Sequence, residues 1–174
     1  QAEDGIRCEL QSRGLGDVYK RQKLNFVSDM DAWLKCHIAL ILPACYLCYA
    51  CSGNLSKATK EQRDLVLDAA WEACEMLKAA HIPVDDKENT DCYRAGTPGR
   101  RKMDAMVLAL CKTPLGRLCV SDHAMHAVAE MQYLDEAFEG LRAQTQTQMT
   151  AWDTLRGQMP SWDIMRKRTA KTRR

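Results

Sequence analysis

The chain has 174 residues, of which 46% are hydrophobic and 28% are charged, with 25 basic and 23 acidic side chains. This length supports one domain with a sizeable core, and the apolar content excludes intrinsic disorder. The net charge of +2 argues against a strong polyanion binder. The charge is unevenly distributed, because six basic residues lie near the C-terminus: Arg166, Lys167, Arg168, Lys171, Arg173 and Arg174.

Nine cysteines would indicate a disulfide framework in a small secreted protein. Here the number is odd, and most of the cysteines lie within apolar runs of helical character. We therefore expect reduced thiols that pack in the core of a cytosolic protein. The longest apolar run, residues 38–51, is shorter than the ~20 residues needed to span a bilayer, so we expect a buried core helix and no membrane partner.

The first 22 residues show no apolar periodicity, and the chain does not begin with Met. Residues 1–7 and 12–22 back-translate into strings that resemble the two constant parts of a transposon-type sequencing adaptor. We therefore expect residues 1–22 to be non-native and the natural protein to extend upstream of Lys23. The alternative is a native N-terminal extension. Gly14-Leu15-Gly16 lacks the third glycine and the preceding strand of a dinucleotide-binding loop.

The remaining residues show helical periodicity and no alternating strand pattern of useful length. Ser28, with Asp31 three residues later, predicts the start of a first helix. The apolar residues of this helix span positions 33–51, and Gly53-Asn54 predicts a left-handed end.

Thr59 and Gln62 have the spacing of a capping box and predict the start of a second helix. Apolar residues at three- and four-residue spacing follow until Pro83 stops the helix. Residues 84–100 are polar and contain two glycines and a proline, so we expect a loop there.

A short third helix is predicted over residues 103–111. Ser121 predicts the cap of a fourth helix, whose apolar stripe continues to Leu141. A weaker helix over residues 148–156 and a basic tail complete the chain. The expected fold is therefore all-α, with about five helices.

Lys35 is the first candidate for chemistry, because it lies on the apolar face of the most hydrophobic predicted helix. A lysine in that setting favours a role in proton transfer, and the alternative is a lysine that extends its ammonium group to water. Pro43 removes the N–H that would pair with the carbonyl of Ala39. That carbonyl is then able to accept a hydrogen bond from a ligand, and the alternative is a simple kink.

Two groups of residues have the spacing of metal ligands: Cys45, Cys48 and Cys51, and also His123, His126 and Glu130. The cysteine run lacks the fourth cysteine and the proline of an iron–sulfur motif, so we expect it to pack in the core. The histidine group has no matching carboxylate-and-histidine helix, so we expect a solvated or substrate-facing surface. We expect no metal at either group.

Three segments carry a resemblance to a known family: DMDAWLKCHIALILPACYLCYACSGNL (residues 29–55), MLKAAHIPV (residues 76–84) and SDHAMHAVAEMQYL (residues 121–134). They resemble the C-terminal helical domain of the ketopantoate reductase family. We therefore expect residues 23–145 to form this domain, and residues 146–174 to form a weak helix and a basic tail. The resemblance implies an N-terminal Rossmann domain that binds NADPH, and reduction of a 2-keto acid to a 2-hydroxy acid.

The resemblance also implies roles for individual residues. Lys35 matches the family's proton-donating lysine by position, and Asp104 is a loose counterpart of its late acidic residue. The family places asparagines four and eight residues after the lysine, where this chain has Ala39 and Pro43. We therefore expect a 2-keto acid other than ketopantoate, in contact with Ala39, Asp104 and His123.

The expected function is that of a 5′-truncated NADPH-dependent reductase of 2-keto acids, which lacks its Rossmann domain and is inactive alone. The expected partners are a small 2-keto acid and the missing Rossmann domain. The resemblance is compatible with a homodimer, and we expect no nucleic-acid partner. Two other interpretations stay open: a helical metal or redox protein that uses the cysteines and histidines, and a non-enzymatic binding module that uses residues 166–174.

Overall fold

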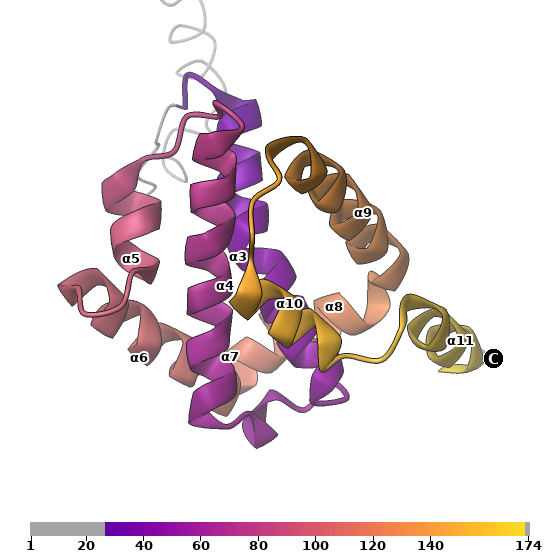
Figure 1. Ribbon diagram of the computed structural model, residues 1–174. Coiled ribbons are helices and arrows are strands. Elements are labelled where there is room, and N and C mark those ends of the chain that lie inside the picture. The colour runs from indigo at the N-terminus through magenta and orange to yellow at the C-terminus, as the bar shows by residue number, and fades with distance from the viewer. Residues whose placement is uncertain (1–26, 173–174) are drawn as a thin grey trace, which may run out of the picture. The chain divides into compact units, whose positions relative to one another are not determined.

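The computed structural model describes residues 27–172, except for the side chains of Glu88 and of residues 169–172. The expected non-native segment, residues 1–22, lies outside the described residues. The chain divides into two units at Met30 and Asp31, and the second unit contains the helical fold (Figure 1). Within the described range every regular element is a helix and none is a strand, which confirms the expected all-α class.

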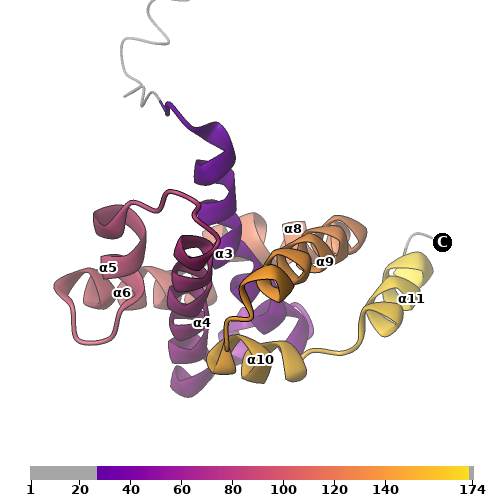
Figure 2. The ribbon, with the colours of Figure 1, turned by 45° about the horizontal axis from the view of Figure 1, so that its top comes forward.

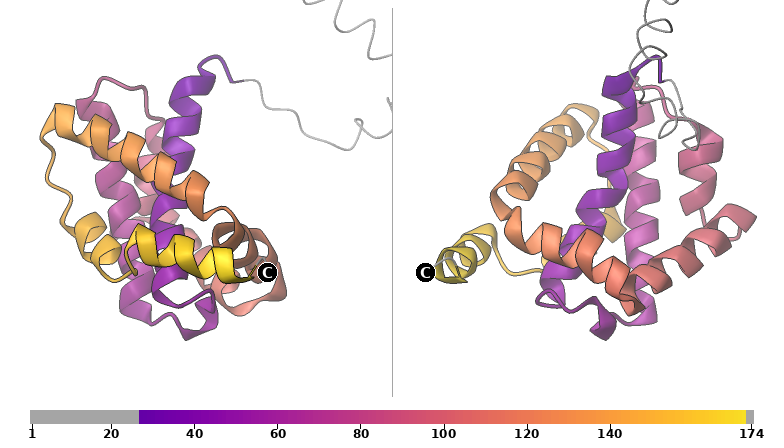
Figure 3. Two further views of the ribbon diagram at one scale, coloured as in Figure 1. Left: turned by 90° about the vertical axis from the view of Figure 1, so that its right-hand side faces the viewer. Right: turned by 180° about the vertical axis from the view of Figure 1, so that it is seen from behind.

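The two longest helices lie side by side and run in opposite directions (Figures 1 and 3). Helix α3 spans Met30–Ala50, and helix α4 spans Lys60–Ala79 after a short 3₁₀ turn, η1 (Leu55–Lys57). The chain reverses after α3 through Ser52 and Gly53, whose φ angles are 52° and 81°. The sequence predicted this left-handed end one residue later, and glycine adopts such a φ without a steric cost.

The start of α4 confirms the predicted capping box. The Thr59 hydroxyl oxygen accepts the Gln62 N–H at 3.2 Å, and the Gln62 side-chain oxygen accepts the Thr59 N–H at 3.1 Å. Two backbone donors that a helix start leaves unpaired are therefore satisfied reciprocally.

Helix α3 lies within the bounds that Ser28 and Gly53-Asn54 predict, and it extends beyond the apolar run of residues 38–51. It contains 21 residues, and by length and composition alone it is a candidate membrane span. In this structure 56% of its most apolar stretch is buried inside the protein. A core helix passes the same test, and packing against the other helices accounts for its composition equally well.

The segment expected to be a loop, residues 84–100, is largely helical, so that expectation is wrong. It contains a π-helical turn, η2 (Asp86–Thr90), a short helix, α5 (Asp91–Tyr93), and the first turn of α6 (Pro98–Lys112). Helix α6 begins before the predicted residue 103, because the Thr97 hydroxyl accepts the Arg100 N–H at 3.0 Å. Pro98 fits the first helical position, where its missing N–H would have no partner anyway.

The predicted fourth helix is divided into several elements. They are the end of the π-helical turn η3 (Arg117–Asp122), α8 (His123–His126) and α9 (Val128–Thr145), and a short helix, α7 (Pro114–Gly116), precedes them. Ala127, with φ −100° and ψ 26°, separates α8 from α9. Ser121 lies inside η3 and is buried, so the prediction that it caps the helix is wrong.

The last two helices of the chain pack against α4 and α9. Helix α10 (Thr150–Gly157) lies beside α4 (Figure 2), and α11 (Trp162–Thr172) lies beside α9 (Figure 3). The residues expected to form a basic tail are thus helical as far as Thr172. Helix α10 has no capping side chain of its own, and the Glu72 carboxylate of α4 accepts the N–H groups of Ala151 and Trp152 at 3.0 Å. A carboxylate at this end also complements the helix dipole.

A buried carboxylate joins four of these helices. Asp135 of α9 is 0% exposed. It accepts hydrogen bonds from Tyr46 of α3 at 2.5 Å and from Trp162 of α11 at 2.8 Å. Arg156 of α10 donates two more, at 2.9 and 2.7 Å. Burial, together with the neighbouring Asp135 charge, raises the pKa of Tyr46, so this hydroxyl stays protonated and donates.

Asp135→Asn is expected to lower the free energy of unfolding by about 2 kcal/mol, because a buried amide cannot accept all the hydrogen bonds that Tyr46, Arg156 and Trp162 donate to the carboxylate. Glu136→Gln is the matched control, since the neighbouring side chain is exposed, and it should change the free energy by less than about 0.5 kcal/mol. Urea unfolding followed by circular dichroism measures both. Equal stability of the two variants would contradict a central role for Asp135.

Candidate functional site

Lys35 lies in the second turn of α3, on the same side of the helix as Ala39. Its side chain is 33% exposed, which is the behaviour of the alternative, a lysine that extends its ammonium group to water, and not that of a desolvated lysine. The Nζ group donates to the carboxylate of Asp31, one helical turn earlier. The sequence assigned Asp31 to helix capping. In the structure Asp31 forms an ion pair with Lys35, the candidate proton donor.

The predicted contact at Ala39 is not accessible in this structure. Helix α3 continues through Pro43, and both Ala39 and Pro43 are buried. Ala39 is 0% exposed, so its carbonyl group is out of reach of a substrate in this arrangement. The face of α3 beyond Lys35 thus contributes to the core, through Leu42 and Tyr46.

Asp104 lies on α6, where it has a structural partner. It forms an ion pair with Arg100 at 3.2 Å, and Arg100 is 7% exposed. The same guanidinium also contacts Asp68 at 2.7 Å and the carbonyl oxygen of Tyr93 at 2.6 Å. Arg100 therefore fastens α6 to α4 and α5, and Asp104 helps to neutralise its charge.

His123 is exposed at the start of α8, and α8 packs near the C-terminal end of α3. The Tyr49 hydroxyl fixes this position, because it donates to the carbonyl oxygen of Ala124 at 2.9 Å. Tyr49 is about four helical turns from Lys35, roughly 20 Å along α3. The structure therefore does not bring His123 to Lys35.

Asp104 is also remote from Lys35. It lines a hollow of about 330 Å³ together with Lys60 and Asp64, at the N-terminal end of α4. The other end of α4 is the one near Lys35, since the Cys36 thiol contacts the carbonyl oxygen of Pro83 at 3.8 Å. Of the residues predicted to form the site, only Lys35 and Ala39 lie close together.

The two groups with metal-ligand spacing do not form a metal site. Among the described residues, no group of three or more His, Cys, Asp or Glu side chains could hold a metal ion. Cys45 and Cys48 are buried, and the Cys45 thiol contacts the sulfur of Met131 at 3.4 Å. The break at Ala127 separates His126 from Glu130, so the predicted continuous helical face is interrupted.

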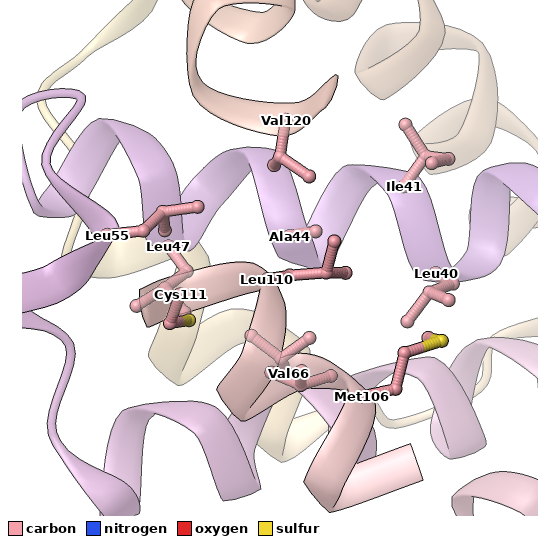
Figure 4. Close-up of a pocket in the computed structure, with 11 residues that line it drawn as sticks. Leu40, Ile41, Ala44, Leu47, Leu55, Val66, Met106, Leu110, Cys111 and Val120 are labelled. Carbon is pink, nitrogen blue, oxygen red and sulfur yellow. The ribbon is translucent and has the colours of Figure 1, made fainter. Parts of the chain in front are cut away.

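An apolar hollow of about 80 Å³ lies between α3, α6 and η3 (Figure 4). Leu40, Ile41 and Ala44 of α3 line one side of it. Met106 and Leu110 of α6 lie across from them. Because its lining offers almost no polar atom, it cannot orient the carboxylate of a keto acid.

Sequence reasoning missed the polar side chains that position these elements. Glu72, Arg100 and Asp135 each bind groups on helices far away in the chain. None of them belongs to a local motif, so no spacing rule identifies them. A charged residue on the apolar stripe of a helix is the one sequence signal of such a buried polar side chain. Asp135 shows this signal, because it lies between Met131 and Phe138 on the apolar stripe.

Comparisons of the chain with protein-family models, curated proteins and solved structures found no match. They neither support nor contradict the resemblance to ketopantoate reductases.

The thiols differ in burial, so their reactivity tests whether the cysteines pack in the core. Burial raises the pKa of Cys45 and Cys74 to about 12 and that of Cys48 to about 11, whereas Cys119 is exposed. At pH 8, iodoacetamide should label Cys119 at least about 10²-fold faster than these three, because the thiolate is the reactive form. Peptide mass spectrometry measures the rates. Labelling of Cys45 as fast as Cys119 in the folded chain would contradict its burial.

Proposed function

We propose that this chain forms the helical domain of an NADPH-dependent reductase of a small 2-keto acid, with Lys35 as the proton donor. The observation that carries the proposal is the position of Lys35 in the second turn of α3, where its partly exposed side chain is accessible to a substrate. The resemblance of residues 29–55 to ketopantoate reductases supports the same role.

The chemistry of an ammonium group suits this reaction. Reduction of a ketone places negative charge on its oxygen, and a nearby acid must supply a proton. The Lys35 ammonium group can stabilise that charge in the transition state and then transfer a proton from Nζ to the oxygen. The neutral amine takes a proton back from water, because the Lys35 side chain is partly exposed.

The described residues do not fit a nicotinamide cofactor. They contain no strand, and therefore no strand, glycine loop and helix that would hold a dinucleotide. In this proposal a Rossmann domain outside the described residues binds the cofactor. The described helices then contribute the proton donor and the surface around it.

The proposed substrate is a 2-keto acid other than ketopantoate. The two positions that follow Lys35 on its side of α3 carry Ala39 and Pro43, which offer no side-chain hydrogen bond. The structure places Asp104 and His123 away from Lys35. Their contacts with the substrate therefore stay predictions. The proposed substrate class therefore depends on the reaction, reduction of a ketone beside a carboxylate, and not on a pocket whose residues recognise the whole substrate.

Lys35→Met, in the chain joined to an NADPH-binding Rossmann domain, is expected to lower turnover of 2-keto acids at least ~10²-fold, the usual contribution of a general acid. Lys35→Arg should lose nearly as much, because arginine keeps the charge and does not give up its proton. Lys57→Met, at another exposed lysine, is the control and should leave turnover unchanged.

Oxidation of NADPH followed by absorbance measures all three variants. Turnover of Lys35→Met within a few-fold of the unmodified chain would remove Lys35 from the mechanism. Full activity of Lys35→Arg would show that the charge alone matters, and would contradict proton donation.

A further inference from the structure

Lys35 has one acidic partner, Asp31, among the described residues. The two side chains lie four residues apart, on the same side of α3, and form an ion pair. Trp33 and His37 stack on each other on a different side of the helix, with ring centroids 5.3 Å apart. The Trp33 and His37 rings therefore do not lie between the Asp31 carboxylate and the Lys35 ammonium group.

We propose that Asp31 is a positioning residue that holds the Lys35 ammonium group in place for proton transfer. This inference rests on the proposed function of Lys35. Asp31 itself does not donate a proton to the substrate, and its effect passes through Lys35.

The location of Asp31 suits this task. It lies in the first turn of α3, where the helix dipole favours a carboxylate. A lysine side chain has four carbons and many rotamers, so an unpaired ammonium group would sample many positions. The ion pair selects those positions in which Nζ stays on the Asp31 side of α3.

The Asp31 charge also acts on the substrate. A 2-keto acid carries a carboxylate, which the Asp31 carboxylate repels as the substrate approaches the Lys35 ammonium group. Removing the charge should therefore improve substrate binding and, at the same time, release the ammonium group. The Asp31 side chain is 77% exposed, so a merely structural role would change neither quantity.

The first test uses the chain as it is and measures amine labelling. Acetic anhydride modifies the free amine of each lysine, and peptide mass spectrometry gives each rate. Asp31→Asn should raise the labelling rate of Lys35 about three- to fivefold, the scale of an exposed ion pair. Asp31→Glu should leave the rate close to that of the unmodified chain, since a glutamate four residues before a lysine also reaches it.

Asp64→Asn is the matched control, because Asp64 pairs with Lys60 at 2.6 Å with the same four-residue spacing. It should raise the labelling rate of Lys60 and leave that of Lys35 unchanged. An unchanged Lys35 rate in Asp31→Asn would overturn the proposal. A rise of the Lys35 rate in Asp64→Asn would also overturn it, because the effect would not be specific to Asp31.

The second test uses the chain joined to an NADPH-binding domain, with pyruvate, a small 2-keto acid, as the probe. Asp31→Asn should lower kcat about fivefold and lower KM about threefold, and Asp31→Glu should restore both. Unchanged constants, or a higher KM, would overturn the positioning role. If Lys35→Met keeps its turnover, the proposed function fails, and the labelling rates still report separately whether Asp31 holds Lys35.

Discussion

The arrangement of the C-terminal helices depends on one buried carboxylate. Asp135 is removed from water, which is costly for a charged group unless hydrogen bonds compensate. Donors from α3, α10 and α11 supply that compensation through Tyr46, Arg156 and Trp162. Since each donor lies on a different helix, the carboxylate is stable only when all of them pack on α9. The same polar group thus fixes which helices meet and in which register.

The sequence predicts well what local patterns determine. The capping box of Thr59 and Gln62 and the apolar spacing of α4 depend on neighbours within one or two turns, and both are confirmed. The predicted start of α6 is too late, although Thr97 and Pro98 are a local signal for it. The sequence does not predict the cap of α10. Helix α10 takes its cap from Glu72, which lies in α4 and is distant in the chain. Such partners have no local signature, because tertiary packing brings them together.

The candidate site shows the same division. The helical spacing of the sequence predicts that Lys35 lies on the apolar face near the start of the first helix, and the structure places it in the second turn of α3 with a partly exposed side chain. The resemblance groups Asp104 and His123 with Lys35. The structure places Asp104 near the N-terminal end of α4 and His123 near the C-terminal end of α3, and both ends are remote from Lys35. Asp104 instead balances the buried guanidinium of Arg100. The functional proposal therefore depends on a single acid and the ion pair that holds it.

The central claim, that one carboxylate couples separate helices, is tested most directly by a double-mutant cycle. Tyr46→Phe and Trp162→Phe each remove one donor to Asp135, the first with its six-membered ring kept and the second with the indole replaced by a smaller phenyl ring. Urea unfolding of both single variants and of the double variant gives the coupling free energy. A shared acceptor predicts a coupling of about 1 kcal/mol or more. Additivity within about 0.3 kcal/mol would show that the two bonds act independently, and would contradict the account.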